Sequence, residues 1–322
     1  MIGRAAGGTK RTVAAAANFT KTASLCKKTV KLARALALAA SLLAAPAAAH
    51  PSRGIAVDER GTVYFSDLIR VWRIDGARLR LVRRNPGTHT HALAIDPAGR
   101  LVWEESAYDP ARNSYAESIW QLAGNRVSRR LGPLSPPPRG LGITFDRAGC
   151  SFHADQAARG GPALVHRWCR GRPSVRLVGT AADDRRFRPA LVNDIGGTAL
   201  AADGRFVFRH GGMVRAVGRR GRVQLLARNV ANENFGIALD PAGALLVAEH
   251  GKRRVLRVVG GRATIAARSP AGWGPTGVAA GRGFIVLLEA SDHRRGEPAR
   301  MRVRRIAGGR SQVLAEVAVP QP

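Results

Sequence analysis

Six positions in the sequence carry side chains that could bind a cation or a polyhydroxy ligand, and they recur at one place in a repeated pattern. Each stands six residues after the glycine of a tight turn: Asp67, Glu105, Asp155, His210, Glu249 and Glu289. Carboxylate oxygens and an imidazole arranged in a ring could hold a divalent cation such as calcium. The alternative is structural, because short polar side chains often cap the loop that follows them. The sequence leaves both interpretations open.

Further candidates lie close to the repeats, in the segments that join them. They are His89 and His91 in GTHTHA, Asn193 and Asp194 in LVNDIGG, Asn234 in NENFG, and His250. Two histidines two residues apart share one face of a strand and suit a metal ion, although the same pair also fits an ordinary hydrogen-bonded loop. Together with the six recurring positions, these residues are the predicted ligand-binding or channel-face candidates.

The elements that must position these residues are six copies of a strand–turn–strand pattern. The copies read IAVDERGTVYFSD, LAIDPAGRLVWEE, ITFDRAGCSFHAD, ALAADGRFVFRH, IALDPAGALLVAE and VAAGRGFIVLLE. The turn glycines are Gly61, Gly99, Gly149, Gly204, Gly243 and Gly283. In four copies an Asp stands three residues before the glycine, where it can accept hydrogen bonds from the turn backbone. These Asp and Gly residues therefore serve the turn rather than a ligand.

Two further alternating segments follow each hairpin, so each repeat predicts four antiparallel strands, and the repeats recur about every 40 to 55 residues. Six such units predict an all-β chain folded as a six-bladed β-propeller. The repeats run from Gly54 almost to Pro322, which leaves residues 50–322 as a single domain. In a propeller the loops that enter the inner strands and those that follow the second strands gather on one face, where we expect the candidate residues.

The segments GIAVDERGTVYFSD and FGIALDPAGALLVAEHGKRRVLRV resemble NHL-type propeller repeats. The whole chain resembles the gluconolactonase-like, senescence-marker-type superfamily of six-bladed propellers. Gluconolactonase-like hydrolases hold a calcium-type cation with a Glu, Asn residues and an Asp set directly before inner strands. Here those places read Arg53, Leu141, Phe235 and Thr276. A metal site would need residues in another register, for which the candidates are Glu105, Asn193, Asn234 and Glu249.

Two cysteines, Cys150 and Cys169, flank the second hairpin of the third repeat. Cys150 opens the second strand and Cys169 ends the third, so an antiparallel pair places them opposite each other. In an oxidising compartment such a pair forms a disulfide. We therefore predict a cross-strand disulfide with a structural role.

Residues 1–49 predict an export signal. They contain eight basic residues and no Asp or Glu, and an apolar stretch from Ala35 ends in Ala47-Ala48-Ala49, a small-residue cleavage site. The apolar run is shorter than the roughly 20 residues that a membrane-spanning helix needs, so no stable span is expected after cleavage. The mature chain would begin at His50 and be periplasmic or secreted.

The chain is strongly basic, with a formal net charge of +30, of which about +22 remains after removal of residues 1–49. The basic residues are spread through every segment, without the interleaved aromatic residues that bind single-stranded nucleic acid. Nucleic acid is therefore not an expected partner. The expected partners are a small molecule, a glycan or a protein, bound by a monomer.

The sequence thus predicts an exported propeller that binds a carbohydrate-like, anionic or protein ligand at its channel face. The first alternative is a metal-dependent lactone or ester hydrolase of gluconolactonase type, with a carboxylate or a histidine as general base. The second is a quinone-dependent sugar dehydrogenase, which rests on architecture alone. The sequence does not decide whether the protein is an enzyme, and no catalytic residue is assigned.

Overall fold

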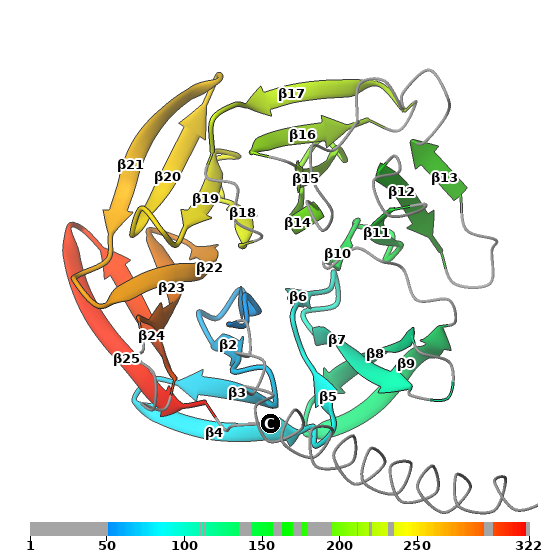
Figure 1. The fold of residues 1–322 in the computed structure, drawn as a ribbon, viewed down its shortest axis with the longest axis horizontal. Helices are drawn as coiled ribbons and strands as arrows, with labels where there is room; N and C mark the ends of the chain where they lie inside the picture. Colours follow the sequence, from blue (N-terminus) through cyan, green and yellow to red (C-terminus); the bar gives the residue numbers. More distant parts are fainter. Residues whose placement is uncertain are drawn as a thin grey trace, which may run out of the picture. The chain divides into compact units, whose positions relative to one another are not determined.

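The computed structural model describes residues 51–109, 111, 114–134, 143–156, 163–169, 175–178, 195–210, 212–218, 221–230, 235–292 and 299–319. These residues belong to one compact unit, His50–Pro322. Figure 1 shows its strands in six antiparallel sheets arranged as blades around an axis. The predicted six-bladed β-propeller is confirmed. Within the described part of the chain, no helix is long and apolar enough to cross a membrane.

The first three blades begin with short inner strands and end on the outer rim. Blade 1 consists of β1 (Ile55–Val57), β2 (Val63–Ser66), β3 (Arg70–Asp75) and β4 (Arg78–Arg84). Blade 2 consists of β5 (Thr88–His89), β6 (Leu93–Ile95), β7 (Leu101–Asp109), β8 (Ser114–Ala123) and β9 (Arg126–Leu134). Blade 3 consists of β10 (Thr144–Phe145), β11 (Ser151–Gln156), β12 (Ala163–Trp168) and β13 (Val175–Val178).

The last three blades each have four strands in chain order. Blade 4 consists of β14 (Ile195–Leu200), β15 (Phe206–His210), β16 (Met213–Val217) and β17 (Val223–Ala227). Blade 5 consists of β18 (Ile237–Leu239), β19 (Leu245–Glu249), β20 (Arg254–Val259) and β21 (Arg262–Arg268). Blade 6 consists of β22 (Trp273–Gly281), β23 (Phe284–Ser291), β24 (Arg300–Ala307) and β25 (Arg310–Ala318).

Blade 2 differs from the expected four strands because it contains the additional strand β5. The long strand β7 pairs with β6 at Leu101–Trp103 and with β5 further along, where His89 lies opposite Ser106. Because β7 extends beyond its pairing with β6, the remaining part of β7 pairs with β5, which comes before β6 in the chain.

The turn between the first two strands of a blade explains the Asp and Gly of the repeats. In blade 1 the Oδ1 atom of Asp58 accepts hydrogen bonds from the backbone N–H groups of Arg60 and Thr62, at 3.0 and 2.8 Å. Gly61 has a φ of 82°, which favours glycine. The same pattern recurs at Asp96, Asp146 and Asp240. The structural interpretation of these residues is confirmed.

The apolar core lies between the blades, and every pair of neighbouring blades shares one buried cluster. Phe65 of blade 1 packs with Leu288 of blade 6, for example, and Val247 of blade 5 packs with Val207 of blade 4. The other four interfaces have clusters of the same kind. Since each blade buries apolar side chains on both faces, the hydrophobic effect holds the ring together.

The inner strands approach one another closely at glycines that lie in them or directly before them. A Cβ atom on Gly277 would lie 2.5 Å from the carbonyl oxygen of Arg53 and 2.9 Å from the side chain of Ile55. Blade 6 therefore meets blade 1 backbone to backbone near the axis. This contact and the bond from Arg70 Nη2 to the carbonyl oxygen of Ala318, 2.5 Å long, close the ring.

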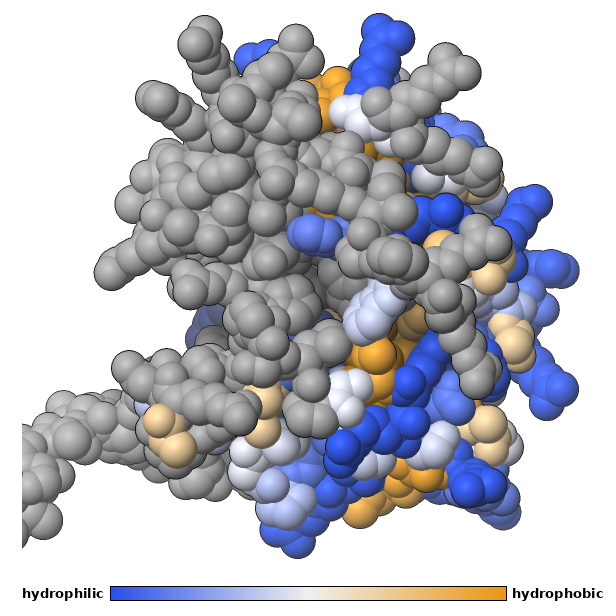
Figure 2. Space-filling view, turned by 90° about the vertical axis from the view of Figure 1, so that its right-hand side faces the viewer, coloured by the Kyte–Doolittle hydropathy of each residue, from blue (hydrophilic) through white to orange (hydrophobic). Residues whose placement is uncertain are grey.

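The outer surface mixes hydrophilic and apolar side chains. Figure 2 shows the two kinds interspersed on one side of the molecule. Leu81 on the outer strand β4 is 50% exposed and Ile265 on β21 is 43% exposed. Single exposed apolar residues of this kind are normal on soluble domains.

Candidate functional site

The blades share one antiparallel strand order, so their inner strands enter the ring from the same face, and the described residues at the entry of these strands lie around the channel mouth. Backbone hydrogen bonds fix the equivalence: Ser66 donates to Gly54, Glu104 to Ala92 and Ala248 to Gly236. The residue before each of these acceptors is Arg53, His91 and Phe235, and Thr276 holds the corresponding place before Gly277. We call these four residues, from blades 1, 2, 5 and 6, the entrance ring.

Arg53 is the charged member of the entrance ring, and it is only 8% exposed. Burial lowers the pKa of Arg53 to about 10; the nearby Glu104 carboxylate acts in the opposite direction, and Arg209 lowers it further. Since an arginine with this pKa remains protonated at neutral pH, Arg53 places a positive charge at the channel mouth.

Glu104 and Arg209 lie at equivalent positions of the second strands in blades 2 and 4. They are 2% and 1% exposed, and each stands one residue before a member of the recurring series of the sequence, Glu105 and His210. The Nη1 atom of Arg209 donates to the carbonyl oxygen of Ala248 in blade 5 at 3.4 Å. Their electrostatic effect on Arg53 shows that charges from three blades act on one another near the axis.

The segment that carries His89 and His91 is fixed by hydrogen bonds to Thr90. Ser52 and Ser66 both donate from their hydroxyl groups to the carbonyl oxygen of Thr90, at 3.3 and 3.1 Å. The rings of His89 and His91 meet edge to face, with centroids 5.8 Å apart. The two imidazoles are therefore held together at the channel face by blade 1, and His91 is the more buried of the two, at 6% exposure.

Two aromatic rings lie together where blade 5 meets blade 6. The rings of Phe235 and His250 lie 5.2 Å apart with an interplanar angle of 38°. A Cβ atom on Gly274 would meet the ring of His250 at 2.4 Å, so the glycine leaves the space that the imidazole occupies. Phe235 and His250 thus present two adjacent rings close to Thr276.

Four of the six recurring positions are described with their side chains; all four are acidic, and each is held by arginine. Asp67 bonds Arg70 and the indole N–H of Trp72, at 2.7 and 2.9 Å. Glu249 accepts a hydrogen bond from Arg254 at 2.5 Å.

The other two acidic positions are held by arginine in the same way. Glu105 bonds Arg83 of blade 1 at 2.6 Å and the indole N–H of Trp103 at 2.8 Å. Glu289 bonds Arg302 and Arg304, each at 2.7 Å.

Two of these carboxylates also connect neighbouring blades. Arg83 joins blade 1 to Glu105 of blade 2, and Ser269, which follows the last strand of blade 5, donates to Glu289 of blade 6. Glu105 and Glu289 therefore contact the preceding blade, whereas Asp67 and Glu249 bond arginines of their own blades. Asp155 and His210 occupy the equivalent places on the backbones of β11 and β15.

The described candidate residues do not gather into a metal-binding group. Within the described part of the chain, no three His, Cys, Asp or Glu side chains form a group that could hold a metal. Asn193, Asp194 and Asn234, like Leu141, lie outside the described residues.

The entrance ring itself does not suit calcium, which requires six to eight oxygen ligands, many of them anionic. Arg53 brings a positive charge and Phe235 brings no ligand atom, while the hydroxyl of Thr276 donates to the carbonyl oxygen of Leu288 at 3.3 Å. The described residues therefore do not fit the cation that the fold family implies.

Reasoning from the sequence missed the charged centre formed by Arg53, Glu104 and Arg209. For Arg53 the sequence did indicate a place at the channel face, because this residue lies before the first inner strand. For Glu104 and Arg209 the signal was weaker, since only two of the six equivalent positions carry a charge.

Three comparisons place the fold among known proteins. No family model matches the sequence and no curated protein matches it, so the NHL-type resemblance remains a prediction. Solved structures do match. A gluconolactonase from Xanthomonas campestris is 15% identical, with a TM-score of 0.54 over 74% of this chain and 83% of that one. A calcium-binding regucalcin from Agrobacterium tumefaciens is 14% identical, with a TM-score of 0.53 over 77% and 84%.

A luciferin-regenerating enzyme is 13% identical, with a TM-score of 0.55 over 84% of this chain and 95% of that one. At such identities the likeness concerns the fold alone. The chain therefore has the six-bladed propeller architecture found in gluconolactonase-like and regucalcin-like proteins, which supports the resemblance inferred from its repeats.

Proposed function

We propose that this chain, with the six-bladed fold that it shares with gluconolactonase-like proteins, is an exported propeller that binds a ligand at its channel face without a metal ion. The observation that carries the proposal is the composition of the entrance ring. Arg53 offers a guanidinium group and His91 an imidazole, and Phe235 adds an aromatic ring at the equivalent place of blade 5, which is the mixture typical of small-molecule sites. The ligand class is carbohydrate-like, anionic or a protein segment, and the binding unit is a monomer.

The second candidate function is a metal-dependent lactone or ester hydrolase. The fold likeness to a gluconolactonase favours it. In that function Asn193 and Asn234 would supply cation ligands together with Glu105 and Glu249, and a carboxylate or histidine would act as general base. Because Glu105 and Glu249 are bonded to Arg83 and Arg254, both would first have to leave their ion pairs.

Metal dependence separates the two functions. For the purified protein we expect calcium, zinc and a chelator each to leave the Tm unchanged, and hydrolysis of a simple aldonolactone to be independent of added metal. A specific metal present at about a hundred times its Kd would add about 2.7 kcal/mol to the folding free energy and raise the Tm by several degrees. A Tm that rises with calcium, together with calcium-dependent lactone turnover, would favour the hydrolase and reject the binding function.

Export is tested by the N-terminus of the mature protein. When the full chain is produced in a bacterial host with its own N-terminal segment, we expect the protein recovered outside the cytoplasm to begin at His50. The reason is that cleavage signals place small residues directly before the cut, and Ala47-Ala48-Ala49 provide them. Intact-mass measurement of the recovered protein gives the answer. Recovery of the uncleaved chain in the cytoplasm alone would contradict the proposal.

A further inference from the structure

We propose that the outer rim of blades 1 and 2 binds a linear acidic polysaccharide. The contact surface consists of Arg78, Arg80 and Arg83 of β4 and Arg129 of β9, which we call the basic patch. These strands are the outermost of their blades, so the patch is separate from the entrance ring. The inference therefore goes beyond the ligand proposed for the channel face and does not depend on it.

Charged side chains of opposite sign are distributed unevenly between the surface and the interior. Among the described residues, seventeen Lys and Arg residues are exposed, against four acidic ones, Glu59, Asp203, Asp292 and Glu316. The last three of these are paired with Arg205, Arg253 and Arg300. Most of the other acidic residues are buried. The exposed charge therefore favours polyanions as partners.

The excess of positive charge is greatest on the outer strands of blades 1 and 2. These strands, β4 and β9, belong to neighbouring blades of the ring (Figure 1). Together they contain seven arginines and no Asp or Glu. The outer strands of the other blades contain two arginines at most. The rim of blades 1 and 2 is therefore the place where the arginines gather.

Strand pairing places three arginines of β4 on the side that faces blade 2. Residues opposite each other in a strand pair share a face of the sheet. Arg80 and Arg83 lie opposite Arg73 and Val71, which are two residues apart on β3, and Val71 belongs to the buried cluster shared with blade 2. Arg78 is two residues before Arg80 and lies on the same face.

Arg129 approaches this face from blade 2. It lies opposite Trp120 of β8, which packs against the same buried cluster. The guanidinium carbon atoms of Arg83 and Arg129 are 3.8 and 5.1 Å from the centroid of the Trp120 ring. One indole therefore joins arginines of two blades into a single patch, and the bond from Arg83 to Glu105 fixes it to blade 2.

Three guanidinium groups of the basic patch are available to a ligand. Arg78, Arg80 and Arg129 are exposed, and within the described part of the chain none of them is paired with a carboxylate. Asp75, which lies opposite Arg78, is paired with Arg73 at 2.8 Å instead.

The arrangement suits a chain of regularly spaced acid groups. A guanidinium group presents several N–H donors in one plane and matches the oxygen atoms of an oxyanion. Residues two apart on a strand are separated by about 6.5 to 7 Å, so Arg78 and Arg80 can contact acid groups that follow one another along a polymer. Carboxylated and sulfated polysaccharides have such groups.

Membranes and nucleic acids fit the basic patch less well. A membrane-binding surface combines basic with apolar side chains. The exposed Leu79 and Leu81 alternate with the arginines of β4 and therefore lie on its other face. Trp120 is half-buried and already contacts two guanidinium groups, so it offers no platform on which bases could stack.

The test compares dextran sulfate with neutral dextran, which share a polysaccharide backbone and differ in charge. Binding to the purified protein is measured by titration calorimetry at low and at raised ionic strength. The patch variant carries Arg78→Gln, Arg80→Gln and Arg129→Gln. The matched control removes three exposed charges from blades 4 and 5 and carries Arg222→Gln, Arg228→Gln and Arg262→Gln.

We expect the wild type and the control variant to bind dextran sulfate with similar affinity. The patch variant should bind about tenfold more weakly or worse, because three exposed charge contacts are lost. Salt should weaken the binding, and neutral dextran should not bind. Equal losses in the two variants would show that net charge alone drives binding and would overturn the inference. A wild type that does not bind dextran sulfate would overturn it as well.

Vesicles that contain phosphatidylglycerol and double-stranded DNA test the class of polyanion. If either binds more tightly than dextran sulfate and loses affinity in the patch variant, the polysaccharide is rejected as the partner. The Tm of each ligand-free variant shows whether it is folded. The double variant with Arg78→Gln and Arg80→Gln leaves the contact between Arg129 and Trp120 intact and should show an intermediate loss. None of these outcomes bears on the ligand of the channel face.

Discussion

Replacing Glu289 by alanine is expected to destabilise the protein by about 3 to 5 kcal/mol, because one partner of a buried ion-pair network is removed while the other partners stay buried. Glu289 has no exposed surface. Its carboxylate accepts hydrogen bonds from Arg302, Arg304 and Ser269, at 2.7, 2.7 and 2.5 Å. Without it, two guanidinium groups in side chains that are about nine-tenths buried would lose their counter-charge.

The effect should extend to the neighbouring blade. Arg304 also donates from Nη2 to the carbonyl oxygen of Arg268, at 2.8 Å, and therefore links β24 of blade 6 to the end of β21 in blade 5. Without Glu289, the guanidinium group of Arg304 loses the carboxylate that helps to hold it in this position. The interface between two blades is weakened, in addition to the loss of one local bond.

Denaturant unfolding of Glu289→Ala and the wild type measures the difference, with Glu316→Ala as the control. Glu316 pairs with Arg300 at 2.6 Å on the surface of the same blade, and such exposed pairs contribute about 0 to 1 kcal/mol. The two variants remove the same charge from two strands of one blade, β23 and β25. Equal losses of stability in both would show that the buried network does not hold the blade.

The same prediction has a pH signature. Burial alone would raise the pKa of Glu289, but the hydrogen bonds from Arg304, Ser269 and Arg302 outweigh it and hold the pKa below its usual value. A carboxylate with a depressed pKa stabilises the folded state above its unfolded pKa, which is about 4.3 for Glu, and this contribution is lost as pH falls through the folded value. The stability gap between the wild type and Glu289→Ala should therefore narrow in acid.

The repeats were enough to predict the fold because its signals are local. Asp58 and Gly61 shape a turn within four residues, and the same chemistry recurs in other blades. Hairpins that recur six times leave few architectures that bury every blade on both faces. The extra strand β5 could not be seen in this way, since Thr88 and His89 acquire a strand partner only through the length of β7.

The candidate site was harder to predict because its contacts are not local. Alternation along a strand shows that Glu105 and Glu289 lie on the same side of their respective blades. It does not show that arginines at a blade interface contact this side. The electrostatic influence of Glu104 and Arg209 on Arg53 depends on the ring bringing blades 1, 2 and 4 together around the axis. In a sequence where arginines occur in every segment, Arg209 carries no distinguishing mark.

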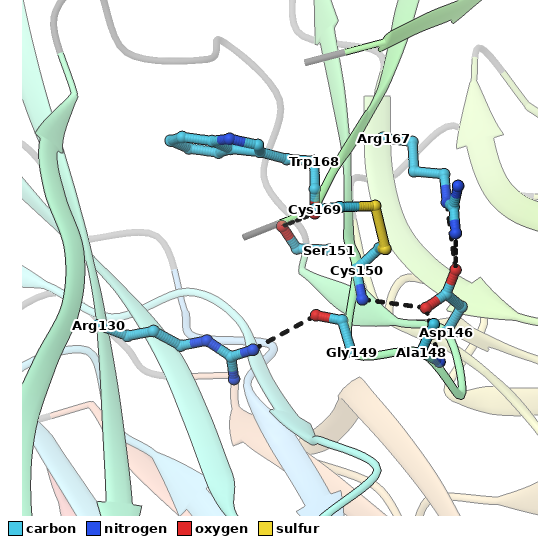
Figure 3. The surroundings of a disulfide bond; sticks show 9 residues. All are labelled: Arg130, Asp146, Ala148, Gly149, Cys150, Ser151, Arg167, Trp168 and Cys169. Atoms are coloured by element: carbon cyan, nitrogen blue, oxygen red, sulfur yellow. Dashed lines mark hydrogen bonds and ion pairs between the residues drawn. A yellow bond between two sulfur atoms is a disulfide. The ribbon is translucent and has the colours of Figure 1, made fainter. Parts of the chain in front are cut away.

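The disulfide between Cys150 and Cys169, predicted from their flanking positions, is present in the structure. Cys150 directly precedes β11 and Cys169 directly follows β12, and Ser151 pairs with Trp168 between them. The bond therefore closes the open end of the hairpin β11–β12 (Figure 3). Beside it, Arg167 bonds Asp146 at 2.7 Å and ties β12 to the turn before β11.

Removal of the disulfide is expected to destabilise the protein by about 3 kcal/mol, the value for a cross-link that closes a loop of this size in the unfolded chain. The two cysteines are 19 residues apart.

Melting with and without a thiol reductant tests this prediction, and a variant with Cys150→Ala and Cys169→Ala is the control. The wild type should lose several degrees of Tm in reductant, to the level of the double variant, and the double variant should not respond. Asp146→Asn provides a second comparison, because it weakens the neighbouring bond to Arg167 without touching the sulfur atoms. If the oxidised protein and the double variant melt at the same temperature, then packing and the Asp146–Arg167 pair alone hold blade 3, and the cross-link contributes nothing to the ring.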